Sequence, residues 1–215
     1  METKVNSSTI YMELKNNIIR GDYPSSFALT ETDLANKFGV CRNTVKKSLM
    51  MLESDGLVTL ERNKGAKVKV YSIEEVLEFL EVREELECLI IRNAIKTISN
   101  EQIEKMASLL AEMKQMKESK NLLGYSNCNR EFHKIIYSAC TNRTAVDMVI
   151  HLKDQMKKYN NKTILVPGRD EASLSEHTKI LEAFKNRDEK SAELYMRLHL
   201  RNVSNTFRDN HSLLF

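Results

Sequence analysis

Residues 30–69 constrain the possible folds of this chain more than any other segment. Two stretches carry apolar residues at helical spacing with a glycine between them, and two short apolar runs follow, joined by a basic turn. This order predicts two short helices connected by a tight turn and then a small β-ribbon. It is the arrangement of a winged helix-turn-helix, which inserts one helix into the major groove of DNA.

Local signals predict where these helices begin and end. Thr30 is placed to cap the first helix, with Asp33 three residues later, and Gly39 supplies the left-handed conformation that ends it. The second helix is expected to start near Arg42, and its inward face carries Val45, Leu49 and Leu52. An earlier supporting helix is expected to end at Gly21 and to bury Ile10, Leu14 and Ile18.

The outward face of the second helix carries side chains suited to DNA. They are Arg42, Asn43, Thr44, Lys46 and Lys47. The arginine fork matches guanine O6 and N7, asparagine can pair with adenine, and lysine can bind guanine or a phosphate. Threonine can contact a phosphate or a thymine methyl group. The alternative is that this is an ordinary exposed helix with basic residues.

The β-ribbon behind this helix favours the DNA interpretation. One strand is expected at Leu57, Val58 and Leu60, and the other at Val68 and Val70. The turn between them carries Arg62, Lys64 and Gly65, two cations and a glycine that permits close backbone approach. A basic hairpin directly after a basic helix is a more specific signal than either feature alone.

These motifs resemble the GntR family of bacterial transcription regulators. The matching runs are Leu29-Thr-Glu31 to Leu34-Ala35, then Val40-Cys-Arg42-Asn-Thr-Val45-Lys46-Lys-Ser-Leu49, and finally Gly65-Ala-Lys-Val68. Three positions depart from the family pattern: Cys41 replaces a serine, Lys46 an arginine and Lys47 an acidic residue. The resemblance implies binding to a double-stranded DNA operator, but these departures leave the operator sequence open.

The excess positive charge falls in the same region. The chain carries 33 Lys and Arg against 30 Asp and Glu. Residues 1–70 hold 11 basic and 8 acidic residues, so the remainder holds 22 of each. The whole excess, although small, therefore lies in the predicted DNA-binding domain, as expected for an electrostatic footprint.

Cysteine spacing and hydropathy predict the compartment. The four cysteines have no C-x-x-C spacing, which is typical of reduced thiols in a cytosolic protein. The sequence shows neither a signal-peptide pattern nor an apolar run near the roughly 18 residues that a bilayer crossing needs. We therefore expect a soluble, cytoplasmic protein with no membrane partner.

The second domain, residues 71–215, is predicted to be an all-helical antiparallel bundle, so the fold class is mainly α. Helices are expected at 72–97, 101–119, 121–140, 143–161, 174–186 and 188–209, with short connections. Three S-x-x-E/Q capping boxes support their starts. These are Ser72 with Glu75, Ser99 with Gln102, and Ser173 with Glu176.

Three histidines of this domain lie in three different predicted helices. They are His133, His177 and His199, and Asn129 lies one helical turn before His133 on the same face. Three imidazoles and one oxygen converging inside a bundle would suit a borderline divalent ion such as Zn, Ni, Co or Mn. The alternative is that they are independent core or surface residues. His151 and His211 show no such pattern.

This half of the chain resembles the FCD ligand-binding domain of FadR-like GntR regulators. The matching runs are Arg83-Glu-Glu-Leu86-Glu87, Asn129-Arg-Glu-Phe132-His133, Glu176-His177-Thr-Lys-Ile180 with Ala183, and Ala192 to His199. The resemblance implies that an aspartate and three histidines hold a divalent ion, with open positions for a small organic acid. Here Asn129 replaces the aspartate, so the ion would be held less firmly and the site would be more positive.

Arg83 is a second candidate for effector binding, because its guanidinium suits a carboxylate. The alternative is an intrahelical pair with Glu87, and both roles are compatible. Together these features predict a homodimeric regulator that binds an inverted-repeat operator and responds to a small organic acid, most commonly by relief of repression. Two other classes remain open: a metal-dependent enzyme acting on a small carboxylate, and an architectural DNA-binding protein that ignores ligands.

Overall fold

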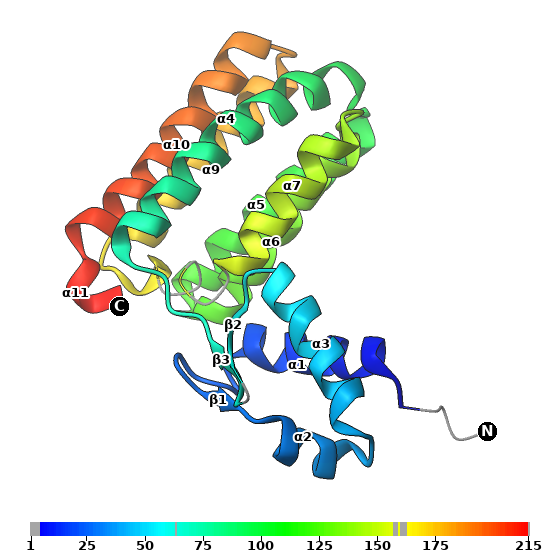
Figure 1. Cartoon of the computed structure of the whole chain (residues 1–215). Coiled ribbons are helices and arrows are strands. Elements are labelled where there is room, and N and C mark those ends of the chain that lie inside the picture. Colours follow the sequence, from blue (N-terminus) through cyan, green and yellow to red (C-terminus); the bar gives the residue numbers. More distant parts are fainter. Residues whose placement is uncertain (1–4, 63, 157–158, 160–162, 215) are drawn as a thin grey trace. The chain divides into compact units, whose positions relative to one another are not determined.

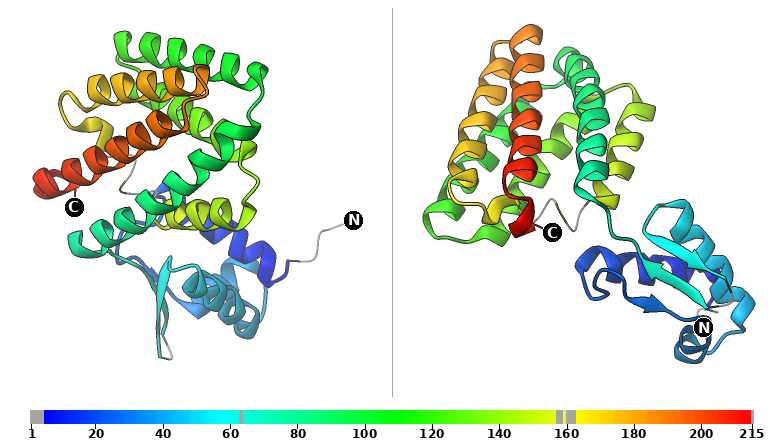
Figure 2. Two further views of the ribbon diagram at one scale, coloured as in Figure 1. Left: turned by 90° about the horizontal axis from the view of Figure 1, so that it is seen from above. Right: turned by 60° about the vertical axis from the view of Figure 1, so that its left-hand side comes forward.

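The structure is a computed structural model that describes residues 5–62, 64–156, 159 and 163–214. The chain divides into two compact units, Met1–Ser72 and Ile73–Phe215, which are shown in Figure 1 and from two further directions in Figure 2. Among the described residues, no helix is long and apolar enough to cross a membrane. Each unit has its own apolar core.

The first unit is a winged helix-turn-helix, as predicted. Its elements are α1 (Ser7–Arg20), β1 (Ala28–Leu29), α2 (Glu31–Phe38), α3 (Arg42–Ser54), β2 (Val58–Glu61) and β3 (Gly65–Val68). The core forms where α1 packs on α3, and it buries Ile10, Leu14, Val45, Leu49 and Leu52 completely. The supporting helix is therefore the one expected from the four-residue spacing.

The helix ends follow the predicted capping residues. The Thr30 hydroxyl accepts a hydrogen bond from the Asp33 amide at 3.2 Å, which satisfies one of the free N–H groups at the start of α2. Gly39 ends the same helix at φ 64°, and Gly21 ends α1 at φ 87°. Both angles lie in the left-handed region that glycine adopts without strain.

The ribbon contains a strand that the sequence did not indicate. β3 is the centre of a three-stranded antiparallel sheet with order β1-β3-β2. The two-residue strand β1 pairs Ala28 with Lys67 and Leu29 with Ala66, and it is too short to show an alternating pattern. The predicted strand ends were also wrong, because Leu57 precedes β2 and Val70 lies beyond β3.

The second unit is an antiparallel helical bundle, as predicted. Its elements are α4 (Ile73–Thr97), α5 (Asn100–Glu118), α6 (Leu122–Ala139), α7 (Arg143–Gln155), the 3₁₀ turn η1 (Thr163–Leu165), α9 (Arg169–Lys185), α10 (Glu189–Asp209) and α11 (His211–Leu214). In Figure 1, α4 and α10 lie side by side and run in opposite directions. The capping box at Ser99 and Gln102 is present.

Two predicted helix boundaries differ from the structure. The expected capping box at Ser173 and Glu176 is wrong, because α9 already begins at Arg169, after Gly168 with φ 78°. Ser173 and Glu176 are therefore inside the helix, where their side chains are free to take part in a buried polar cluster. α7 ends at Gln155 instead of residue 161, and residues 157–158 and 160–161 of that prediction lie outside the described residues.

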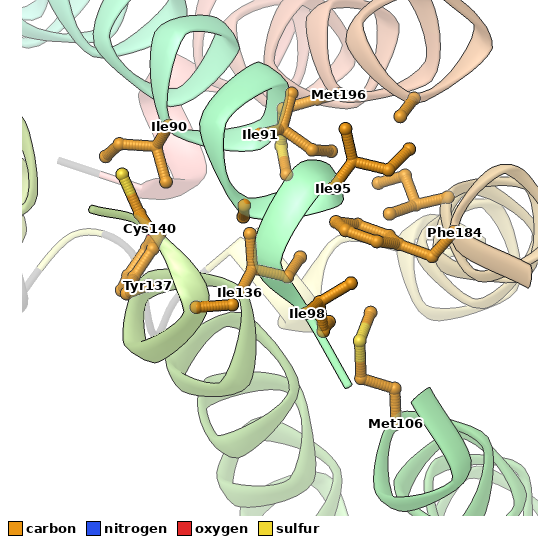
Figure 3. Packing of buried hydrophobic residues seen from close by; sticks show 14 of the residues in the cluster. Ile90, Ile91, Ile95, Ile98, Met106, Ile136, Tyr137, Cys140, Phe184 and Met196 are labelled. Atoms are coloured by element: carbon orange, nitrogen blue, oxygen red, sulfur yellow. The ribbon is translucent and has the colours of Figure 1, made fainter. Parts of the chain in front are cut away.

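The bundle core fixes the helices that carry His133, His177 and His199. Figure 3 shows side chains from α4, α5, α6, α9 and α10 meeting in one apolar cluster. Ile91 and Ile136 from α4 and α6, Phe184 from α9 and Met196 from α10 are fully buried there. Packing at this density holds the helix axes in place, so polar side chains on the same faces have defined positions.

Candidate functional site

Three buried histidines meet between α6, α9 and α10. His133, His177 and His199 are 2%, 0% and 4% exposed. One ring nitrogen from each lies within 4.8 Å of the others, and the two Nε2 atoms of His133 and His177 are 3.1 Å apart. The structure therefore brings together the three histidines that the sequence selected.

Hydrogen bonds orient two of these rings toward a common point. His177 Nδ1 lies 2.6 Å from the Ser173 carbonyl oxygen, and His199 Nδ1 lies 2.7 Å from Glu176 Oε2. A carbonyl and a carboxylate only accept, so both Nδ1 atoms carry the proton. The Nε2 atoms of His177 and His199 then carry a lone pair instead of a proton, which is the state in which histidine ligates a metal.

His133 lies beside a buried ion pair. Its Nδ1 faces Glu87 Oε2 at 3.6 Å, slightly beyond hydrogen-bond length. Glu87 in turn accepts a 2.6 Å hydrogen bond from Arg83 Nε, and both residues are buried. The intrahelical pair of Arg83 and Glu87 predicted from the sequence is thus confirmed. A carboxylate behind a ligating imidazole is a common outer-shell arrangement in metal sites.

Asn129 supplies the test of whether these residues fit a cation. Its Oδ1 is buried and has no hydrogen-bond partner among the described residues. A buried oxygen without a donor is costly and requires an explanation. Asn129 lies one turn before His133 on α6 and lines the same cavity as His133 and His199, so a cation at the histidine cluster is a candidate partner for this oxygen. Three neutral imidazoles and one carbonyl oxygen fit a borderline divalent ion.

Burial keeps all three rings neutral. It lowers the pKa of His133 and His177 to about 3 and the pKa of His199 to about 4. Burial alone would raise the pKa of Glu176, but the hydrogen bond from His199 and the adjacent Arg169 guanidinium hold it at about 2. The cluster therefore combines neutral ligands with a charged carboxylate behind them.

Two residues of this outer layer were missed by the sequence analysis. Arg169 donates to both oxygens of Glu176, at 3.1 and 2.8 Å, and Asn202 donates to Oε1 at 2.8 Å. This fork holds the carboxylate against His199. Glu176 was identified as a capping residue and as part of the run that resembles the FCD domain, with no role behind a metal ligand, and Arg169 lies in the segment expected to precede the helix. The available signal was the pair of opposite charges at Arg169 and Glu176, seven residues apart. These two residues lie on one helix face because α9 begins at Arg169, earlier than predicted.

A cavity of about 600 Å³ adjoins the histidines. Asn129, His133 and His199 form part of its wall, and Arg83 lines it as well. Its apolar surface comes from Tyr125, Tyr137, Val146, Ile150, Ile164 and Val203. This volume matches the usual range for pockets that enclose small ligands.

The predicted DNA-contacting residues lie on the surface of the first unit. Arg42, Asn43, Lys46 and Lys47 of α3 are exposed, and Thr44 is half-buried. The Arg42 guanidinium lies 3.2 Å from Glu31 Oε2, in a pair that water screens. At the tip of the β-ribbon, the wing, Arg62 and Lys64 are exposed.

Gly65 is explained by contacts within the unit. It is buried at φ 109°, and a Cβ at this position would overlap the Leu29 carbonyl oxygen and crowd the Thr30 backbone. The close backbone approach for which a glycine was expected is therefore made to β1 and the start of α2. This contact sets the position of the wing relative to α2.

Known proteins match both units. Residues 6–68 match the model for bacterial regulatory proteins, gntR family, and residues 78–202 match the FCD domain. The chain is 24% identical over 213 residues to the HTH-type transcriptional repressor RspR of Escherichia coli (strain K12), covering 97% of this chain and 93% of that protein. It is 26% identical over 198 residues to the repressor GlaR of the same strain, covering 88% and 90%.

Solved structures show the same fold. E. coli McbR/YncC superposes with a TM-score of 0.76 at 18% identity, covering 96% of this chain and 99% of that one. A GntR regulator from Rhodococcus sp. RHA1 superposes with a TM-score of 0.71 at 19% identity, covering 94% and 97%. The family and the named relatives are transcription regulators rather than enzymes. The chain belongs to the gntR family of bacterial transcription regulators and carries an FCD domain behind its helix-turn-helix.

Proposed function

We propose that this regulator is a homodimeric repressor whose affinity for an inverted-repeat operator is changed by a small organic acid bound in the helical unit. The observation that carries the proposal is the buried histidine cluster with an unpartnered Asn129 oxygen, opening onto a cavity with basic walls. A protein that only shapes DNA would not need such a cluster. Named repressors among the relatives support the sign of regulation.

In this proposal α3 is the recognition helix. Arg42, Asn43, Lys46 and Lys47 contact base edges or phosphates in the major groove, Thr44 contacts a phosphate or a thymine methyl group, and Arg62 and Lys64 of the wing bind the backbone nearby. One such unit contacts only a few base pairs. Two symmetric copies on an inverted repeat supply the specificity that a genome requires.

The metal would be held by His133, His177, His199 and Asn129. Zn, Ni, Co and Mn all accept this donor set. When bound, the ion supplies a positive centre for a carboxylate oxygen of the effector. Because Asn129 brings no charge, the site is more positive than one containing aspartate, which favours an anionic ligand.

The effector must bind one arrangement of the dimer better than another to change DNA affinity. Arg83 contributes to effector binding through its position on the cavity wall, although its Nε is already bonded to Glu87. Its remaining guanidinium N–H groups are the donors available to a carboxylate. The cavity is formed by the helical unit alone, so effector binding can be measured without DNA.

The decisive experiment measures metal and operator binding on the same protein. Untagged protein purified without chelator is expected to contain near-stoichiometric divalent metal by elemental analysis and to lose it on exhaustive chelation. His177→Ala should lower the metal content severely while leaving operator affinity of the ligand-free protein within about twofold. His151→Ala is the matched control, because His151 is exposed on α7.

Two results would contradict the proposal. Normal metal content in His177→Ala would remove this residue from the site. The second is an operator affinity that no small carboxylate changes in a screen that includes chelating acids. That result would favour a ligand-independent DNA-binding protein. The operator for these assays is obtained by selection from random duplexes, which requires no knowledge of the regulated genes.

A further inference from the structure

Lys153 stands out among the cations of the cavity. It lies on α7 and lines the cavity, and its Nζ donates a 3.0 Å hydrogen bond to the Tyr137 hydroxyl. The ammonium also lies 5.1 Å from the centre of the Tyr137 ring. Within the described part of the chain, no carboxylate forms an ion pair with it.

The cavity wall is unbalanced in charge. Of its described residues, only Asp154 is acidic, whereas six are basic: Arg83, Arg130, Lys134, Arg143, Lys153 and Arg169. The two arginines nearest the histidines are matched by Glu87 and Glu176. Lys134 is exposed and pairs with Glu131 at 2.8 Å. Among the described residues, no ion pair joins Lys153 to Asp154 or to any other carboxylate.

Keeping the Lys153 side chain charged in this environment costs free energy. Burial, followed by the repulsion of the Arg83 guanidinium, lowers the pKa of Lys153 to about 8, although Glu87 acts in the opposite sense. A half-buried cation with one neutral hydrogen-bond acceptor has lost hydration without gaining a counter-ion. A bound anion would restore the balance.

Tyr137 links this lysine to the histidines. It follows His133 by four residues on α6, and the two ring centres are 6.1 Å apart. The Tyr137 hydroxyl accepts the hydrogen bond from Lys153, and the Tyr137 ring lies beside the ring of His133. All three residues line the cavity. One small molecule lying along the Tyr137 side chain would thus meet the histidine cluster at one end and the ammonium at the other.

We propose that Lys153 binds a second anionic group of the effector, so that the effector is a small dianion with one carboxylate at the histidine cluster and a carboxylate or phosphate at Lys153. This inference rests on the proposed function, because it concerns the same cavity. It goes further in naming the charge class of the ligand and the residue that selects it.

The test compares ligands that differ only in the second charge. Butanoate is matched with succinate, pentanoate with glutarate, and 3-phosphonopropionate represents the phosphate class. Calorimetry on the metal-loaded full chain should give dissociation constants about 10- to 100-fold lower for the best dianion than for its monoanion, the range of one charge-assisted hydrogen bond. Succinate and 3-phosphonopropionate share a two-methylene spacer, so the tighter binder of these two separates the carboxylate from the phosphate source.

Lys153→Gln should remove most of this preference and leave monoanion binding within about twofold, whereas Lys153→Arg should keep the preference. Lys134→Gln is the control, because it removes a cavity lysine that already has a partner. Equal binding of both ligand classes by the wild type, or equal losses for both in Lys153→Gln, would overturn the assignment of Lys153. Monoanion binding that still depends on His177 would leave the proposed function standing. Failure of every tested anion to bind the wild type would count against both.

Discussion

The two units place their functional residues in opposite environments. In the wing unit, the charged side chains proposed to bind DNA are exposed on α3 and at the ribbon tip, and the buried cluster beneath them consists of aliphatic residues. In the helical unit, the histidines, Glu87, Arg83 and Arg169 are themselves buried. Function and stability are thus separable in the first unit and combined in the second.

The difference follows from what each unit is proposed to recognise. DNA is large, charged and hydrated, so a protein can bind it with an exposed surface on which each basic side chain acts almost independently. A small anion must be enclosed, and its partners then lose water and need counter-charges or fixed hydrogen bonds. Each buried ligand-binding group therefore requires a second group behind it, as Glu176 requires Arg169.

The strongest test of this contrast is Glu176→Gln. It keeps the side-chain shape but leaves the buried Arg169 guanidinium without a counter-ion, and breaking such a pair from one side costs about 3–5 kcal/mol. Urea unfolding after chelation should show this loss in the transition of the helical unit. Glu131→Gln removes an exposed carboxylate from α6 and should cost less than about 0.5 kcal/mol. Equal effects of the two variants would contradict the buried network.

Arg42→Ala in the wing unit should show the reverse: a loss of DNA discrimination with little change in stability. Loss of a bidentate base contact is expected to reduce discrimination between operator and random duplex by about 1–3 kcal/mol. The free energy of unfolding should change by less than about 0.5 kcal/mol, because the pair with Glu31 is solvent-screened. Binding measured at several salt concentrations gives the specificity ratio. An unchanged ratio would remove Arg42 from base recognition.

The same contrast explains how much the sequence could predict. The wing unit is built from neighbours in sequence, so Thr30, Gly39 and the apolar spacing of α3 were enough to locate its helices. The strand β1 was not predictable because two residues contain no periodicity. Its partner is more than 30 residues away, and Gly65, interpreted as a turn residue, is required by that partner's backbone.

In the helical unit, the histidines were found because their types and helical settings suit a metal. The residues behind them were not assigned this role. Arg169 and Lys153 have no local pattern that distinguishes them from surface charges, and the pattern around Glu176 indicated a helix start instead. Their roles depend on which helix face is buried and, for α9, on a start five residues earlier than expected. Only the packed bundle defines these properties.

The smallest expected effect concerns Lys153. Because this proposed anion-binding residue is a cation with no counter-ion pair among the described residues, it is expected to lower the stability of the folded helical unit. Its pKa is about 8 in the folded protein, against 10.5 for an unperturbed lysine. Between these values the unfolded chain binds the extra proton, so stability should rise as pH increases from about 8 to 10.5, and the penalty should be fully present below about 8.

Lys153→Met removes the charge and nearly keeps the length of the side chain. It should raise the free energy of unfolding at pH 7 by about 1–2 kcal/mol and flatten the increase between pH 8 and 10.5. Arg83, Glu87 and Arg130, the charged groups that act on Lys153, remain in place. Urea unfolding of both proteins at several pH values measures the difference. If Lys153→Met is less stable than the wild type and has the same pH profile, the folded chain itself compensates the Lys153 charge. The argument for a bound anion would then fail.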